Sequence, residues 1–254
     1  MINKELHKDP KPLDTQQHRT LRLQNQFSAI ERIAPFTSYM VTLAEFGDAS
    51  HDFPLVFVRA ATDIDGKPQV APIALFGLDR GENVFVEDGK WQADYLPAAF
   101  RSYPFTLAKV DPEGENWAVA FDASWQGFSE TEGERLFDDE GKPTQLLLDV
   151  QKFAQDIEVE IERTRIAGLR LMELELLQPM RFDATLPDGQ KISVDGFLTV
   201  DEKRLAALTD AQVLELHRNG LLGLLHVHRL SLANMRRLVD KRIRRQQAAA
   251  ATAA

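Results

Sequence analysis

The chain has 254 residues, and its 39 acidic and 30 basic side chains give a net charge of −9, which argues against binding to the phosphate backbone of nucleic acids. With 44% hydrophobic and 27% charged residues it is too apolar for a disordered chain and too polar for a membrane bundle. The absence of cysteine excludes disulfides, thiolate nucleophiles and cysteine-ligated zinc.

The first 27 residues are polar, contain Pro10 and Pro12, and predict an extended, poorly ordered arm. They lack the apolar run of a secretory signal. No segment of the chain reaches the roughly 18 to 20 consecutive apolar residues that a membrane-spanning helix needs. We therefore expect a soluble, cytoplasmic protein without a transmembrane segment.

Residues 30–122 predict a β-rich region, because apolar, β-branched and aromatic runs alternate there with turn residues. The runs lie at 53–60, 69–78, 83–88, 105–110 and 117–121. The turns contain Asp65-Gly66, Asp88-Gly89 and the polar segment 111–116. This order favours an antiparallel β-meander in the N-terminal half of the chain.

Residues 143–247 predict a mainly helical region with one inserted β-hairpin. Apolar residues at helical spacing indicate a helix over 145–163, and Thr164 is a candidate N-cap for a second helix that stops at Pro179. The segment 180–200 alternates around Asp188-Gly189, as a hairpin does. Further helices are expected at 201–208, 210–219 and 231–247, the last beginning at Ser231 as N-cap.

Together these elements predict an α+β fold with a single domain over residues 28–247. No fixed-period repeat and no Pro- or Ser-rich linker marks a boundary inside that range. The Ala-rich end, residues 248–254, is expected to be disordered.

Several strings along the chain carry a family resemblance. They are FPLVFVR, PIALFGLDRGENVFVEDGKWQADYLPAAFRSYPF, LFDDEGKPTQLL, LPDGQKISVDGFLTVDEKRLAAL and LHRNGLLGLLHVHRLSLANMRRL. In this order, over about residues 30 to 245, they resemble the SapC family of bacterial proteins. The resemblance implies a connection with surface-layer loci, and with genes near outer-membrane nutrient receptors and near proteins similar to flavin-dependent halogenases and cupin-type oxygenases. It implies no catalytic residue.

Motifs that would indicate an enzyme are absent from the sequence. There is no G-x-S-x-G elbow, no Walker A sequence and no G-x-G-x-x-G, so we predict no catalytic residue and no cofactor. His226 and His228 would share one face of a strand and could hold a metal there, but they diverge in a helix. We favour a structural or exposed role for this pair over metal binding.

Aromatic residues are dense between residues 91 and 128, where all three tryptophans lie. They could fill the core of a small sheet or form a platform for a ligand or partner, since Trp and Tyr combine an apolar body with a polar group. The packing role is favoured. If the region binds a ligand or partner, its candidate residues are Trp91, Tyr95, Arg101 and Tyr103.

A cationic segment, MRRLVDKRIRRQQ, closes the last predicted helix of this acidic protein. Cations at a helix C-terminus complement the helix dipole, which explains part of the cluster. The alternative is an anionic partner surface, either a membrane or an acidic protein. The candidate partner-binding residues are Arg236, Arg237, Lys241 and Arg242.

Two functional hypotheses follow. The first is a non-enzymatic accessory or regulatory protein of the cell envelope or of a nutrient-uptake system, acting by protein–protein binding; it rests on the resemblance and on the lack of a catalytic motif. The second is a small-molecule-binding protein or enzyme, acting on an amino acid or sugar in a pocket between the sheet and the helices. Neither hypothesis fixes an oligomeric state.

Overall fold

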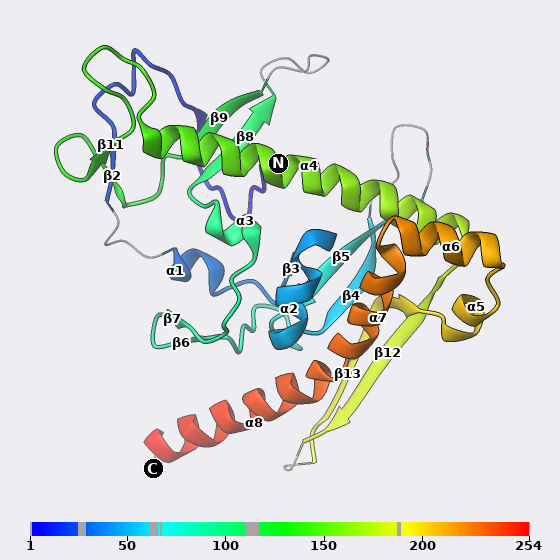
Figure 1. Cartoon of the computed structure of the whole chain (residues 1–254). Coiled ribbons are helices and arrows are strands. Elements are labelled where there is room, and N and C mark those ends of the chain that lie inside the picture. Colours follow the sequence, from blue (N-terminus) through cyan, green and yellow to red (C-terminus); the bar gives the residue numbers. More distant parts are fainter. Residues whose placement is uncertain are drawn as a thin grey trace. The chain divides into compact units, whose positions relative to one another are not determined.

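The computed structural model describes residues 2–24, 29–60, 66, 68–109, 117–186 and 189–253. It divides into two compact units. Unit 1 comprises Met1–Ile33 and Ala98–Val159, and unit 2 comprises Ala34–Pro97 and Glu160–Ala254. The second boundary falls within one long helix, α4 (Gln145–Glu173), drawn in light green in Figure 1.

Unit 1 contains two small antiparallel sheets, one in the order β1-β9-β8 and one in which β2 lies between β10 and β11. The strands are β1 (Pro10–Pro12), β2 (Arg22–Leu23), β8 (Phe105–Lys109), β9 (Trp117–Asp122), β10 (Phe128–Ser129) and β11 (Glu134–Arg135). Short helices α1 (Ile30–Ile33) and α3 (Ala98–Arg101) and the first half of α4 complete it. Its core cluster consists of Phe105, Phe121, Leu136, Phe137 and Leu147.

Unit 2 is built on a five-stranded antiparallel sheet in the order β12-β13-β4-β5-β3. Its strands are β3 (Ser38–Met40), β4 (Leu55–Ala60), β5 (Gln69–Leu75), β12 (Leu177–Thr185) and β13 (Lys191–Val200). The edge strand β12 carries a β-bulge between Met180 and Phe182. A separate hairpin joins β6 (Val86–Glu87) to β7 (Lys90–Trp91) through Asp88 and Gly89, both at positive φ, as a tight hairpin turn requires.

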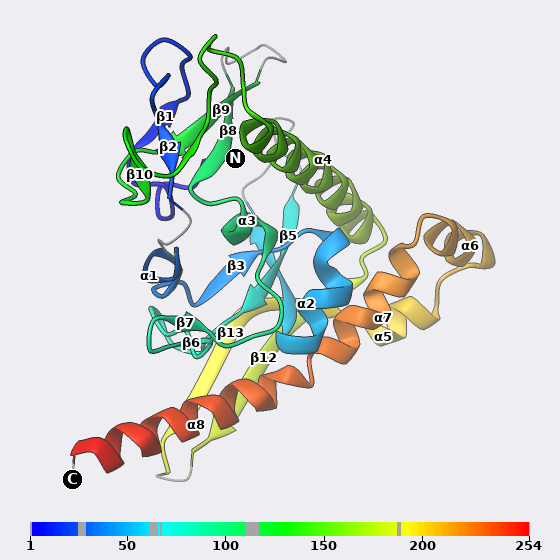
Figure 2. The same ribbon diagram turned by 60° about the vertical axis from the view of Figure 1, so that its left-hand side comes forward.

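The helices of unit 2 are η1 (Leu43–Glu45), α2 (Phe46–Asp52), α5 (Glu202–Ala206), α6 (Asp210–Arg218), α7 (Leu221–Ser231) and α8 (Asn234–Ala253). Helices α2 and α7 lie side by side in both views (Figures 1 and 2). Buried hydrogen bonds tie α7 and α8 to the chain around β4: the Leu55 N–H donates to Ser231 Oγ at 3.0 Å, and Asn234 Nδ2 donates to the Phe53 carbonyl at 3.1 Å.

The predicted α+β class is confirmed, with antiparallel strands in the N-terminal half, helices at the C-terminus and the hairpin β12–β13 inserted between helices. The predicted strand pairs also form, as β4 with β5 and β8 with β9. They belong to separate sheets in different units, and the expected single domain over residues 28–247 stays a prediction. Of the predicted turn residues, Asp65, 111–116 and Asp188 lie outside the described residues.

The N-terminal segment, expected to be a poorly ordered arm, instead adds a strand to unit 1. β1 pairs with β9, and Leu6 and His7 are buried. Pro10 and Pro12 are compatible with this, because β1 is an edge strand and an edge strand can do without some of its N–H donors. At the other end, α8 continues through the Ala-rich stretch to Ala253 instead of ending at residue 247.

The two helices predicted on either side of Thr164 form one continuous helix, α4. Thr164 is buried and does not cap a helix; its hydroxyl accepts the Leu43 N–H at 2.9 Å. Ser231 likewise ends α7 and does not begin the last helix. Within the described part of the chain, no helix combines the length and the hydropathy of a bilayer-spanning segment.

Two helical glycines make the packing of α4 testable. A Cβ placed on Gly168 would stand 2.8 Å from the Val70 carbonyl oxygen, whereas one on Gly223 in α7 would meet nothing within 4 Å. We expect Gly168→Ala to lower the free energy of unfolding by about 1–3 kcal/mol through overpacking. Gly223→Ala should raise it by roughly 0.5–1 kcal/mol through helix propensity. Urea unfolding of both variants measures this; equal effects would contradict the close approach at Gly168.

Candidate functional site

The two predicted aromatic candidates of unit 2, Trp91 and Tyr95, are half-buried. The ring of Trp91 packs against those of Phe53, Phe76 and Phe85, with centroids 5.6 to 6.0 Å apart. Its Nε1 donates to the Tyr95 carbonyl at 2.8 Å. The Tyr95 hydroxyl in turn donates to the buried Glu45 carboxylate at 2.9 Å. These contacts explain Trp91 and Tyr95 as packing residues.

The other two residues of that predicted set, Arg101 and Tyr103, belong to unit 1. Tyr103 is buried, and its hydroxyl donates to Asp122 Oδ2 at 2.9 Å. Arg101 is exposed, with its guanidinium carbon 5.2 Å from the centroid of the Phe153 ring. The four candidates are thus divided two and two between the units, and their binding role stays a prediction.

Asp122, which the sequence did not single out, is the polar centre of unit 1. Its fully buried carboxylate accepts hydrogen bonds from the Lys8 and Asp9 N–H groups, from the N–H and hydroxyl of Ser124, and from Tyr103. Burial alone would raise the pKa of Asp122, but these hydrogen bonds, led by that of Ser124, lower it to about 2. The carboxylate therefore anchors the N-terminal segment.

His226 and His228 separate on α7, as the helical alternative predicts. His226 is exposed, while His228 is fully buried with Nε2 3.0 Å from Thr199 Oγ1 and 3.3 Å from the Val200 N–H, which donates to it. Burial lowers the pKa of His228 to about 4. Within the described residues, no three His, Asp or Glu side chains are grouped so that they could hold a metal ion.

The cationic candidates of α8 differ in how much of their charge is available. Arg236 and Arg237 are exposed, and Arg237 donates to the His51 carbonyl at 3.1 Å. Lys241 Nζ lies 5.0 Å from the centroid of the Phe85 ring. Arg242 is buried, and its guanidinium is ion-paired with Asp79 at 2.5 Å and with Glu82 at 3.5 Å. The partner-binding role of these four residues stays a prediction.

Unit 2 has a groove of about 560 Å³ between η1, α4, α6 and α7, which we call the helical groove. Its apolar lining consists of Leu43, Ala44, Ile166, Ala167, Leu221 and Leu224. Its polar lining consists of Glu160, Arg163, Arg170, Glu215 and Asn219. The sequence does not reveal this groove, because Thr164 resembles an N-cap, and a helix boundary there separates residues that share one face of the continuous α4.

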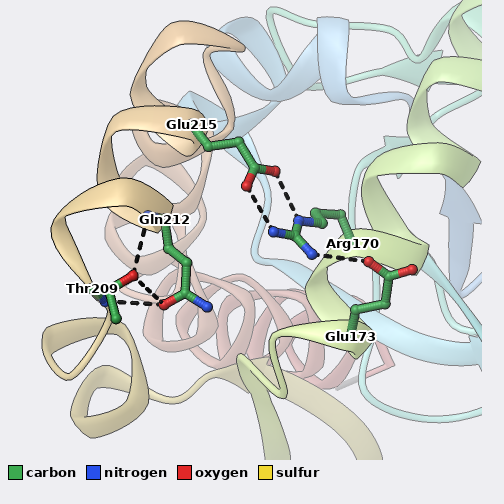
Figure 3. Close-up of polar contacts among 5 residues, drawn as sticks. All are labelled: Arg170, Glu173, Thr209, Gln212 and Glu215. Carbon is green, nitrogen blue, oxygen red and sulfur yellow. Dashed lines mark hydrogen bonds and ion pairs between the residues drawn. The ribbon is translucent and has the colours of Figure 1, made fainter.

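Local capping fixes the helices around the groove. Thr42 and Glu45 form a capping box that starts η1, and the bond from the Leu43 N–H to Thr164 holds η1 against α4. Thr209 and Gln212 form a second capping box that starts α6, drawn in Figure 3. Gly220, at φ +79°, allows the sharp turn from α6 into α7.

An ion-pair network joins α6 to α4 at one end of the groove (Figure 3). Arg170 donates from Nε and Nη2 to the two oxygens of Glu215, at 2.8 and 2.7 Å, and from Nη1 to Glu173 at 3.0 Å. The Glu215 hydrogen bond raises the pKa of Arg170, and the guanidinium lowers that of Glu215. Toward the other end, Arg163 pairs with Glu160 at 2.5 Å.

The four charged side chains of the groove are therefore paired with charged neighbours, while its interior is apolar. General acid–base or nucleophilic chemistry needs a titratable group directed at a substrate, and these four are engaged with one another or with Glu173. The apolar side chain of Ile166, which also lines the groove, is 55% exposed and available for contact. The arrangement suits binding of an apolar surface better than catalysis.

The fold and this groove define an α+β protein whose helices cover an antiparallel sheet and leave an apolar groove between them. The chain belongs to the SapC family: the model of that family matches residues 13–238, which include every residue lining the groove. No curated protein and no solved structure matches the chain.

The buried His228 makes the stability of the protein depend on pH. Its pKa is about 4 when folded and about 6.5 when unfolded, so the unfolded state binds more protons between these values, and the free energy of unfolding falls as pH falls from 6.5 to 4. Between pH 7.5 and 5 this loss amounts to about 2 kcal/mol. We expect the urea-measured loss to shrink by that amount in His228→Asn and to stay unchanged in His226→Asn; equal pH dependence in both would contradict the assignment.

Proposed function

We propose that this protein is a non-enzymatic binding protein and that its helical groove receives an amphipathic helix of a partner protein. The observation that carries the proposal is the combination of an apolar interior with charged side chains that already pair with charged neighbours. Covering the apolar area of such a surface makes the free energy of binding more favourable. The desolvation cost of its charges is small, because they remain paired in the complex.

The spacing of the lining supports a helical occupant. On α4, Glu160, Arg163, Ala167 and Arg170 recur every three or four residues, which places them on one face over about 15 Å, or three helical turns. Grooves between helices are a recurrent site for amphipathic helices, which insert apolar residues at the same spacing. α6, which contributes Glu215, also exposes Val213 and Leu214.

Charge indicates the partner's chemistry at the α6 end of the groove. There, one guanidinium, that of Arg170, faces the carboxylates of Glu173 and Glu215, so the network carries a net charge of −1. The partner helix is therefore proposed to combine an apolar stripe with a Lys or Arg positioned at this end. Electrostatic matching of this kind fixes the orientation and the specificity of binding more than its affinity.

The wider role is an extension of this proposal. The family resemblance supports an accessory or regulatory protein of the cell envelope, of a surface-layer locus or of a nutrient-uptake system, and we propose a cytoplasmic location for it from the sequence. The second candidate, a protein that binds a small molecule, is favoured by the volume of the groove, since about 560 Å³ lies within the roughly 300–1,000 Å³ of ligand pockets. An amino acid or sugar is a poorer match than an apolar ligand, because the polar lining is already paired.

The absence of cysteine allows a site-specific test. A photo-crosslinker on Ile166→Cys, at the groove, is compared with one on Leu230→Cys, since Leu230 is 77% exposed on α7 and does not line the groove. In native cells we expect the first probe alone to crosslink a partner segment whose sequence has the apolar period of an amphipathic helix. A synthetic peptide with the sequence of this partner segment should bind the protein saturably, as measured by fluorescence anisotropy.

Ile166→Glu should weaken binding of this peptide by about tenfold or more, because it places a charge against an apolar stripe, whereas Leu230→Glu should leave it unchanged. Both residues are exposed, so the melting temperatures should stay close to that of the parent protein. A peptide that binds Ile166→Glu as tightly as the parent would refute the helix-binding proposal. An apolar small molecule seen in native mass spectrometry, and lost only in Ile166→Glu, would establish the second candidate in its place.

A further inference from the structure

A second concavity of unit 2, separate from the helical groove, has a cationic lining. It lies between α8 and the region of β6 and β7, has a volume of about 310 Å³, and we call it the α8 pocket. Three basic side chains of α8 line it, together with one carboxylate and one amide. These residues are Lys241, Arg244, Arg245, Glu87 and Gln92.

Two of the three cations are held in place by the protein itself. Arg245 donates from Nη1 to the Asn83 carbonyl at 2.6 Å and from Nη2 to the Val86 carbonyl. Lys241 lies over the Phe85 ring. Arg244, on the same face of α8 one turn after Lys241, is exposed. The pocket is therefore largely pre-organised for a ligand, which lowers the entropy that binding costs.

The three cations of the α8 pocket lack the carboxylate partners that several arginines of unit 2 have. Arg170, Arg204, Arg229 and Arg242 all pair with carboxylates. Among the residues that the structure describes, no carboxylate forms an ion pair with Lys241, Arg244 or Arg245. With Glu87 included, three positive charges and one negative charge leave a net charge of +2 around the pocket, in a chain whose net charge is −9.

The helix dipole does not explain this cluster. α8 continues to Ala253, eight residues beyond Arg245, which is more than two turns. The dipole of a helix acts on charges within its last turn, so Lys241 and Arg245 lie too far from the end to complement it. The positive charge of the pocket is complementary to an anionic ligand.

We propose that the α8 pocket binds the dianionic phosphoryl group of a phosphate monoester. A dianion matches the net charge of +2, and a guanidinium and an ammonium are the side chains that best donate hydrogen bonds to phosphoryl oxygens. Gln92 adds an amide beside them. The concave shape suits a group of this size better than the flat contact of a membrane surface or an acidic protein would. This inference is independent of the helical groove.

Isothermal titration calorimetry with glycerol 3-phosphate tests the proposal. We expect saturable 1:1 binding to the parent protein, weakened by about tenfold or more in Arg244→Glu. Arg236→Glu is the matched control, because it makes the same charge change on an exposed residue of α8 outside the pocket. Lys241→Met, which keeps an apolar contact with Phe85, should also weaken binding. Equal weakening in Arg236→Glu and Arg244→Glu would overturn the proposal, and so would the absence of Arg244-dependent binding to both glycerol 3-phosphate and phosphatidic acid vesicles.

Vesicle sedimentation distinguishes the source of the phosphoryl group. Binding to phosphatidic acid vesicles that depends on Arg244, without binding to glycerol 3-phosphate, would identify a lipid headgroup; the reverse would identify a soluble phosphate monoester. Both outcomes support the pocket. Equal binding to phosphatidylserine vesicles, which lack a phosphate monoester, would indicate general attraction to anionic surfaces and would overturn it.

Discussion

The geometry of unit 2 depends on the close approach of α4 to β5 at Gly168. A helix can come this near to a strand only where a side chain is missing, because a Cβ at this position would meet the Val70 carbonyl. One turn earlier on α4, Thr164 uses the same inward face to bind η1. These two contacts fix α4 and η1, which form two walls of the helical groove. The ion pair between Arg170 and Glu215 holds α6 as the third wall.

Polar side chains in this protein fall into two kinds according to how their hydrogen bonds are used. Asp122 in unit 1 and Arg242 in unit 2 are buried and engaged by their neighbours, Asp122 through hydrogen bonds and Arg242 through ion pairs. Truncating Asp122 would leave buried N–H and hydroxyl donors without their acceptor. Arg244 and Lys241 line a concavity and have no carboxylate partner among the described residues. Pairing, more than residue type, thus separates structural charges from those available to a ligand.

The sequence predicted what local rules determine. Alternating apolar runs located β4, β5, β8 and β9, and Asp88-Gly89 marked a turn that adopts positive φ. What it could not predict depends on contacts between distant residues. Threonine is a common N-cap residue, so Thr164 resembles the start of a helix. Inside α4 its hydroxyl instead accepts the N–H of Leu43, which is 121 residues away in the sequence. The same holds for the N-terminal strand β1, which is ordered by Asp122, and for the groove, which needs four helical elements at once.

The edge strand β12 has a consequence for how molecules of this protein meet one another. A nine-residue strand at the end of a sheet offers backbone donors and acceptors that could template another strand, and such edges lead to aggregation. Here Pro179 removes one donor, the bulge between Met180 and Phe182 interrupts the ladder, and Arg181 and Asp183 place charges along it. These features disfavour the pairing of this edge with the same edge of another copy, and therefore the growth of a sheet from one molecule to the next.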